Sequence, residues 1–206
     1  LAMSIFGQSY GTNISGQLYL DGKEVHLKTI KQAIKNKLAY VTEDRKGNGL
    51  VLTNPIKINT TLANLDSISP RMIIDKDKEY QVAEEYRGKL KTKCPTVEQN
   101  VGNLSGGNQQ KVLLAKWMFT DPDVLILDEP TRGIDVGAKY EIYCIINDLV
   151  AAGKSVVMIS SELPEVLGMS DRIYIMNEGR IAGELSAEEA TQEKIMSIIV
   201  SSGKGA

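Results

Sequence analysis

A serine followed by two glycines stands before a helix-prone stretch, in the segment Leu104-Ser105-Gly106-Gly107-Asn108-Gln109-Gln110. Small residues let a ligand approach the backbone closely, and the first turn of a helix offers unpaired N–H groups to an anion. The arrangement therefore favours phosphate binding around Ser105. A Ser-Gly-Gly triplet by itself is more often an ordinary loop, so this interpretation depends on a second feature nearby.

Two adjacent carboxylates follow the next apolar run. The segment Val124–Leu127 is continuously apolar, as in a strand buried on both faces, and it ends in Asp128 and Glu129. The carboxyl end of such a strand opens on the crevice where α/β sheets bind ligands. Asp128 suits Mg²⁺ through bound water, and Glu129 is then free to orient or deprotonate an attacking water. Taken alone, two ordinary acids after a strand are the alternative.

Elements that alternate between strand and helix position these residues. A second apolar run covers 155–159, a helix is predicted from 138 to 152 with Gly153 at its C-terminal turn, and a third strand covers 172–176. This alternation predicts an α/β fold with a parallel sheet. The sequence Ser186-Ala187-Glu188-Glu189 has the form of a capping box and predicts the start of a C-terminal helix.

The sequence of the N-terminal half predicts short secondary-structure elements. Residues 1–7 indicate the end of a helix stopped by Gly7, and Asp21-Gly22 between two alternating segments predicts a hairpin. A helix near 29–36 and a short strand over 38–41 follow. Residues 54–100 are polar and helix-prone, which indicates a helical insertion and not a separate domain.

The composition is typical of a soluble globular chain of one or two domains. Of 206 residues, 42% are hydrophobic and 24% are charged, and the net charge of −2 gives no basic footprint for nucleic acid. No apolar run approaches the ~20 residues needed to span a bilayer. We expect a cytosolic chain, and its abrupt beginning at Leu1 suggests a fragment of a longer product. His26 is expected on the surface, and Trp117 is expected in packing.

Together the Ser105 and Asp128 segments resemble the signature motif and the Walker B strand of ABC ATPases. The resemblance spans at least 43–184: Thr131–Asp135 is similar to the D-loop, and Glu162–Val166 stands where the family continues after its switch strand. Two further sequence segments narrow the resemblance to one subfamily. The segments Glu43–Lys46 and Ala190–Glu193 resemble the second half of tandem monosaccharide-importer ATPases of the xylose, galactoside and multiple-sugar type.

The resemblance implies a P-loop NTPase-like ABC core with an antiparallel β piece, forming one partial nucleotide-binding domain over 1–206. A helical signature subdomain would be inserted at about 54–120. Two halves pack head to tail in this family, so the signature would bind ATP held mainly by the second half of the same polypeptide. The implied signature ligands are Ser105, Gly106, Gly107 and Gln109. In this half's own site, Asp128 would bind Mg²⁺, Glu129 and Ser161 would be catalytic, and Glu43 and Asp135 would belong to neighbouring loops.

The implied assembly hydrolyses ATP to drive monosaccharide import. It would lie on the cytoplasmic face of the bacterial inner membrane, with membrane permease subunits, a sugar-binding protein and no nucleic acid. Because sugar specificity resides in other subunits, the sequence does not name the sugar.

Three departures from the family pattern bear on activity. The phosphate loop Gly-x-x-x-x-Gly-Lys-[Ser/Thr] is absent; the family places it just before Leu1, so we expect this chain alone to be inactive. Glu43 stands where a glutamine is usual, and Ser161 stands where a histidine is usual. A hydroxyl cannot reproduce the proton handling of an imidazole. One alternative is therefore a degenerate, non-hydrolysing scaffold that presents Ser105 in trans; a soluble ABC protein of nucleic-acid metabolism is less favoured.

Overall fold

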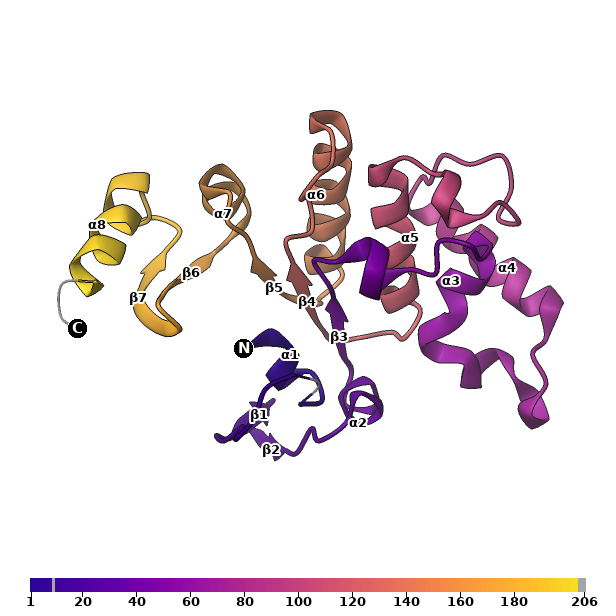
Figure 1. Ribbon diagram of the computed structural model, residues 1–206, viewed down its shortest axis with the longest axis horizontal. Coiled ribbons are helices and arrows are strands. Elements are labelled where there is room, and N and C mark those ends of the chain that lie inside the picture. The colour runs from indigo at the N-terminus through magenta and orange to yellow at the C-terminus, as the bar shows by residue number, and fades with distance from the viewer. Residues whose placement is uncertain (9, 204–206) are drawn as a thin grey trace. The chain divides into compact units, whose positions relative to one another are not determined.

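A parallel sheet is the centre of the first of two compact units into which the chain divides. The computed structural model describes residues 1–8 and 10–203, and the units meet between Ile159 and Ser160. In the first unit the strands run in the order β3-β4-β5, with all pairs parallel (Figure 1). Their bounds are β3 Leu38–Val41, β4 Val124–Asp128 and β5 Ser155–Ile159. The alternating strand and helix pattern of the sequence predicted this sheet, and the prediction is confirmed.

The strands of this sheet differ in burial. Every residue of β3 is buried, and so is the centre of β4, as their continuous apolar runs predicted. Strand β5 instead alternates, with Val157 51% exposed and Ile159 38% exposed. The expectation that this strand is buried on both faces is therefore wrong. The physical reason is that two helices, Ile30–Lys35 and Gly106–Met118, pack on β3, whereas one helix, Val136–Ala151, packs closely on β5, so fewer side chains cover β5.

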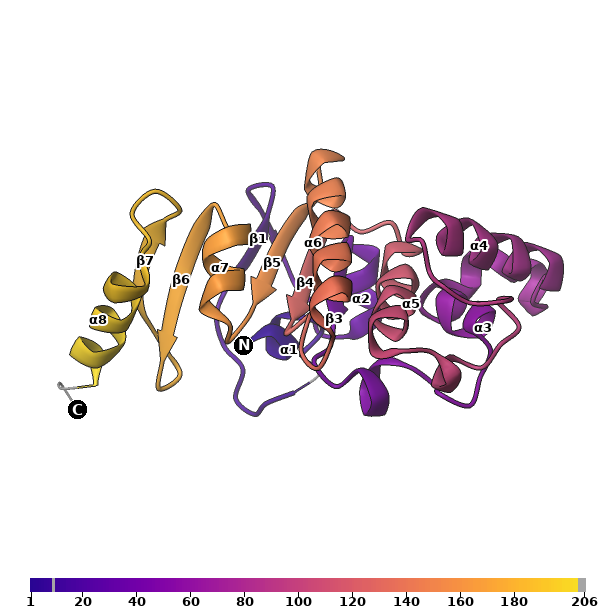
Figure 2. The same cartoon turned by 90° about the horizontal axis from the view of Figure 1, so that it is seen from above.

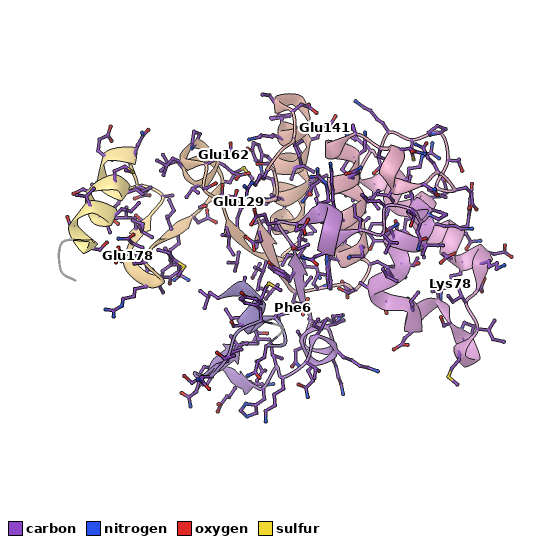
Figure 3. All side chains as sticks on the ribbon, viewed as in Figure 1. Phe6, Lys78, Glu129, Glu141, Glu162 and Glu178 are labelled. Carbon is purple, nitrogen blue, oxygen red and sulfur yellow. The ribbon has the colours of Figure 1, made fainter. Side chains whose placement is uncertain are left out.

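Aromatic packing fixes the N-terminal segment against the sheet. Helix α1 (Ala2–Ile5) is followed by Phe6, whose ring lies 5.8 Å from that of Tyr40 and stands edge-on to that of Trp117 at 5.3 Å (Figure 3). Trp117 thus has the packing role that its position predicted. Gly7 follows with a φ of 72°, a left-handed conformation that suits the predicted helix stop.

The predicted hairpin is present between β1 (Leu18–Leu20) and β2 (Lys23–Val25). Its turn residues Asp21 and Gly22 have φ values of 49° and 73°, as a two-residue turn between antiparallel strands requires. Helix α2 (Ile30–Lys35) then leads to β3, close to the predicted bounds. His26 lies between them and is exposed, as expected.

Helices make up the segment between β3 and β4. Helix α3 (Ile56–Thr61) contacts both α4 (Lys76–Lys89) and α5 (Gly106–Met118), which places these three helices in one cluster (Figure 2). The helical character predicted for 54–100 is confirmed, whereas the proposed subdomain bounds of 54–120 stay a prediction. Helix α6 (Val136–Ala151) follows β4 and packs on α5 and β5. Gly153 ends it with a φ of 84°, as predicted.

The second unit contains two helices and an antiparallel strand pair. Its elements are α7 Leu163–Met169, β6 Arg172–Asn177, β7 Arg180–Ser186 and α8 Gln192–Ser202. The predicted strand over 172–176 is present, but it pairs antiparallel with β7 and not within a parallel sheet. The two-residue turn at Glu178 and Gly179 causes this difference, because both adopt positive φ and reverse the chain directly.

The predicted start of the C-terminal helix is wrong by several residues. Ser186 and Glu189 do exchange the hydrogen bonds of a capping box, with Ser186 N donating to Glu189 Oε2 at 3.3 Å. They close a turn, however, and helix α8 begins at Gln192, where the Thr191 hydroxyl accepts from Lys194 N at 3.2 Å. Across the described residues, no helix has the length and apolar character needed to cross a bilayer.

Candidate phosphate-binding site at the start of helix α5

Helix α5 begins with backbone donors that have no acceptor in the described ranges 1–8 and 10–203. Ser105 is its N-cap residue, yet its Oγ accepts from the Asn108 side-chain amide at 2.9 Å and caps no backbone N–H. Within the described part of the chain, the N–H groups of Gly106, Gly107 and Asn108 therefore remain without a hydrogen-bond partner. Three such donors beside an exposed serine form the kind of helix start that binds a phosphate.

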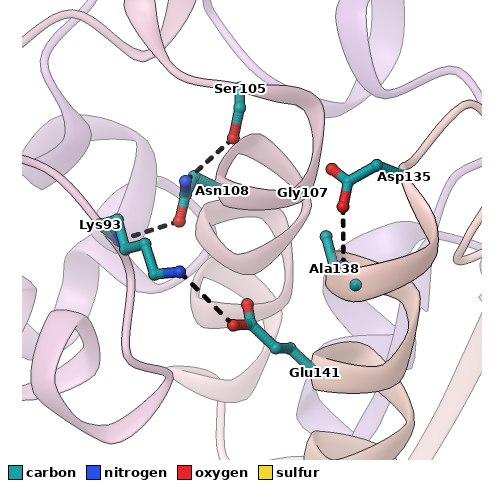
Figure 4. A pocket seen from close by; sticks show the side chains of 8 residues that line it. Lys93, Ser105, Gly107, Asn108, Asp135, Ala138 and Glu141 are labelled. Carbon is teal, nitrogen blue, oxygen red and sulfur yellow. Dashed lines mark hydrogen bonds and ion pairs between the residues drawn. The ribbon is translucent and has the colours of Figure 1, made fainter.

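An open pocket adjoins this turn, and Figure 4 shows its lining side chains. One wall consists of Lys93, Ser105, Gly107 and Asn108, and the other consists of Asp135, Gly137, Ala138 and Glu141 at the start of α6. The structure thus brings Ser105 and Gly107 of the predicted signature together with Asp135, which the sequence assigned to a different loop, whereas Gly106 is not among the lining residues. Neither Asp128 nor Glu129 is among the lining residues of this pocket.

Packing also restricts the two signature glycines, and it restricts Gly107 much more tightly than Gly106. A Cβ atom added at Gly107 would lie 2.5 Å from the Cβ of Ala138, a separation that no side chain tolerates without movement. At Gly106 the added atom would lie 3.3 Å from Nη2 of Arg45 and 3.4 Å from the carbonyl of Gly133. The absence of side chains here therefore allows α6 and two loops to approach the turn as closely as it allows a ligand.

Gln109 faces the interior and does not line the pocket. Its side chain is buried, its Nε2 donates to the Leu104 carbonyl at 3.1 Å, and its Oε1 accepts from Arg45 Nε at 3.3 Å. It supports the turn from within. A direct contact of Gln109 with nucleotide stays a prediction.

An ion pair joins α5 to α6 beneath the pocket. Lys111 Nζ lies 2.8 Å from Glu141 Oε2 and also donates to the Lys91 carbonyl at 3.0 Å. The Lys111 side chain is only 2% exposed, whereas that of Glu141 is 42% exposed. The hydrogen bond from Lys111 lowers the pKa of Glu141 below its ordinary value. The pair therefore places one ammonium and one carboxylate group near the first turn of α5.

Asp128 lies at the end of β4 and accepts a hydrogen bond from a neighbouring strand. The hydroxyl of Tyr40 donates to Asp128 Oδ2 at 2.7 Å. Burial, followed by this hydrogen bond, raises the pKa of Tyr40 above its ordinary value. Sequence reasoning missed Tyr40, although a signal existed. In the parallel register Tyr40 pairs with Ile126, two residues before Asp128, so both side chains lie on the same face of the sheet.

Glu129 leaves the strand in a left-handed conformation. Its φ is 46°, and its N–H donates to the carbonyl of Ile159 at 2.9 Å (Figure 3). Mg²⁺ prefers oxygen ligands, so the carboxylate of Asp128 is suited to bind this ion. The bound ion would neutralise phosphate charge. Ser161 belongs to the second unit and precedes α7 there.

The departure at Glu43 has a structural partner. Glu43 Oε1 accepts from Arg132 Nη1, and the two side chains form an ion pair. Arg132 belongs to the segment after β4, between Glu129 and the α6 cap Asp135. Asp135 in turn accepts from Ala138 N at 2.9 Å. Arg132 was not singled out in the sequence, because nothing local indicates a contact with Glu43.

Comparisons with known proteins show the family to which this chain belongs. The family model described as "ABC transporter" matches residues 1–132. The chain is 59% identical over 199 residues to the L-arabinose transport ATP-binding protein AraG of Geobacillus stearothermophilus, covering 97% of this chain and 39% of that protein. It is 56% identical over 196 residues to the xylose import ATP-binding protein XylG of Thermoanaerobacter pseudethanolicus, covering 95% and 39%. To the ribose import ATP-binding protein RbsA of Clostridium tetani it is 49% identical over 201 residues, covering 97% and 39%.

Solved structures confirm the predicted fold class. An ATP-binding cassette of an ABC transporter, MJ1267, superimposes with a TM-score of 0.78 at 20% identity, covering 95% of this chain and 81% of that one. Its ADP conformation gives a TM-score of 0.73 at 20% identity, covering 99% and 82%. By contrast, the chain spans only about two fifths of the length of the three curated relatives above.

Proposed function

Because the chain belongs to the ABC transporter family, we propose that it supplies the signature and Walker B parts of an ATPase that energises bacterial monosaccharide import. The observation that carries this proposal is the open pocket at the start of α5, where three backbone donors lack acceptors among the residues that the structure describes. The relatives are named for the transport of arabinose, xylose and ribose, which supports a monosaccharide as the transported substrate.

The two groups of functional residues serve two different nucleotides in this proposal. Ser105, Gly106 and Gly107 bind the phosphates of an ATP that a second half of the same polypeptide holds in head-to-tail pairing. Asp128 holds Mg²⁺, and Glu129 orients the attacking water at this half's own site. The support is that Asp128 and Glu129 do not line the pocket around Ser105. The partners proposed are permease subunits and a sugar-binding protein, at the cytoplasmic face of the bacterial membrane.

A second candidate is a half that presents its signature without hydrolysing ATP. The ion pair of Glu43 with Arg132 favours this candidate, since it holds a carboxylate where the resembled family usually has a neutral amide. Ser161, in place of a histidine, weakens the same half further. In both candidates Ser105, Gly106 and Gly107 bind phosphate. The candidates differ only in whether Glu129 takes part in ATP hydrolysis.

The first test compares the chain alone with the intact protein. The printed sequence contains no phosphate loop, whose backbone donors and lysine provide most phosphate contacts, so the chain alone should neither bind ATP tightly nor hydrolyse it. The intact protein, assembled with its permease and sugar-binding protein in vesicles, should hydrolyse ATP faster when arabinose, xylose or ribose is present. Calorimetry and phosphate release provide the measurements. Micromolar ATP affinity of the chain alone, or an intact assembly without ATPase activity, would contradict the proposal.

A further inference from the structure

A short helical turn, Arg45–Gly49, contacts α5 and follows Glu43 and the N-cap residue Asp44. Asp44 Oδ1 accepts from Gly47 N at 2.9 Å, and the carbonyl of Asp44 accepts from both Asn48 N and Gly49 N at 3.0 Å. A Cβ added at Gly47 would lie 2.3 Å from Asp44 Oδ2, so only glycine allows the Asp44 side chain to close over this turn. The start of the turn, and with it the position of Arg45, is therefore fixed.

The Arg45 side chain reaches the first turn of α5. Its Nε lies 3.3 Å from Gln109 Oε1, and its Nη1 lies 3.3 Å from Gln110 Oε1. Both glutamines are buried, and burial lowers the pKa of the Arg45 guanidinium from its ordinary value. The planar guanidinium presents several N–H groups in a fixed fork, so it bonds two neighbouring amides at once.

The far end of the same turn is also attached to α5. The carbonyl of Gly49 accepts from Lys116 Nζ, and a Cβ added at Gly49 would lie 3.0 Å from Cδ2 of Leu113. On its other side, the segment is anchored by the ion pair between Glu43 and Arg132. The residues from Glu43 to Gly49 thus connect the signature helix with the loop that follows β4.

We propose that Arg45 is a positioning residue that holds Ser105, Gly106 and Gly107 in the arrangement needed to bind ATP from the opposite half. This inference rests on the proposed function. Arg45 acts through Gln109 and Gln110, because their residues share the first turns of α5 with the phosphate donors. Without the guanidinium, both buried amide oxygens lose a charged donor, and the turn gains freedom to move.

The test uses the intact protein with its permease and three variants. Arg45→Met keeps an unbranched side chain and removes the donors, whereas Arg45→Lys keeps the charge but not the fork. Lys46→Met is the matched control, because Lys46 is the next residue, is exposed, and makes no hydrogen bond or ion pair within the described residues. Arg45→Met should lower kcat for ATP about tenfold or more. The KM should change much less, because the opposite half holds most of the nucleotide.

Arg45→Lys should recover only a minor part of kcat, and Lys46→Met should match the parent protein. A KM that rises in proportion to the fall in kcat, or equal constants for Arg45→Met and Lys46→Met, would overturn the inference.

Hydrogen exchange gives a second readout that does not need ATPase activity. Arg45→Met should speed the exchange of the amides of residues 109–112, while those of β4 stay protected. Gln110→Met should have the same local effect, and combining it with Arg45→Met should add little, because the two side chains share one interaction. Uniformly faster exchange in both single variants would mean a general folding role and would count against the inference. If the parent assembly lacks ATPase activity, the proposed function fails, and the exchange data still decide the role of Arg45.

Discussion

The hydroxyl of Tyr40 and the carboxylate of Asp128 form one of the shortest side-chain contacts at the carboxyl end of the sheet, at 2.7 Å. A hydrogen bond to a charged acceptor contributes about 1.5–3 kcal/mol to stability. Tyr40 also packs against Phe6 in a buried cluster that includes Ile126. This side chain therefore combines core packing with the orientation of the expected Mg²⁺ ligand.

Removing the hydroxyl should destabilise the first unit in a way that depends on pH. Tyr40→Phe should lower the free energy of unfolding at pH 7 by about 1.5–3 kcal/mol. Because the pKa of Tyr40 is raised in the folded state, its contribution is complete below the ordinary tyrosine pKa of about 10 and is lost as the pH rises further. The difference between parent and variant should therefore narrow above about pH 10.

Urea unfolding followed by the fluorescence of Trp117 provides the measurement, since this tryptophan packs on the same Phe6 ring. Tyr19→Phe is the control, because Tyr19 is 53% exposed and should show no change. Equal losses in the two variants would contradict the predicted role of the hydrogen bond.

Residue types with strong local signals were predictable, whereas partners distant in the chain were not. Ser105 stands before two glycines, and Asp128 stands at the end of an apolar run. These patterns correctly predicted that Ser105 precedes a helix and that Asp128 ends a strand. The contact from Arg45 to Gln109 spans 64 positions, and that from Tyr40 to Asp128 spans 88. Such pairs depend on tertiary packing, which the local sequence does not reveal.

At the scale of elements, α5 and α6 are joined by charge as well as by close packing. Lys111 is almost completely buried, and its partners are Glu141 and the carbonyl of Lys91. Removing the carboxylate would leave a buried ammonium group with a neutral acceptor alone, which is costly. Water reaches Glu141, so the cost is smaller than for a fully buried pair.

Glu141→Gln should therefore lower the free energy of unfolding by about 1–2 kcal/mol at pH 7. The pKa of Glu141 is lowered in the folded state, so its contribution is present above the ordinary glutamate pKa and is lost as the pH falls. The difference between parent and variant should begin to narrow below about pH 4 and should disappear only below the lowered pKa of Glu141. Thermal unfolding across this pH range provides the measurement.

A suitable control is Glu184→Gln in the second unit. Glu184 lies 3.7 Å from Arg172, both side chains are at least half exposed, and such surface pairs contribute little. A loss at Glu184 as large as that at Glu141 would show that burial of Lys111 is not the cause.

Element types were more predictable than their ends and partners. Apolar periodicity and the Asp21-Gly22 turn predicted β1 to β5 in kind and place. The start of α8 was not predictable from Ser186, because a capping box also closes an isolated turn. The antiparallel partner of β6 was not predicted, because the turn at Glu178 and Gly179 does not by itself indicate that the strand Arg180–Ser186 follows it.

At the scale of the whole assembly, the signature should matter more than this half's own carboxylate. In the intact transporter, Gly107→Asp should reduce ATP turnover at least about tenfold, because it places a side chain and a negative charge where a phosphate approaches. Glu129→Gln should be milder, since Ser161 and Glu43 already weaken that site. ATP turnover in vesicles, with sugar and binding protein present, provides the measurement.

Gly107→Ala separates the two effects at Gly107. It brings the added Cβ into the same 2.5 Å contact with Ala138 but carries no charge. A larger loss for the aspartate than for the alanine would therefore report on phosphate repulsion. Equal and complete losses for Gly107→Asp and Glu129→Gln would show that the site containing Glu129 performs hydrolysis.

The contact between Gly107 and Ala138 also has a mechanical consequence. The starts of α5 and α6 are in such close contact at these two residues that not even a methyl group would fit between them. A rotation of α6 about its own axis must displace Gly107 or push the two helices apart. Helix α6 extends to Ala151, so a force applied at its distant end acts as on a lever. The short arm of that lever is the first turn of α5, which carries the N–H groups of Gly106, Gly107 and Asn108.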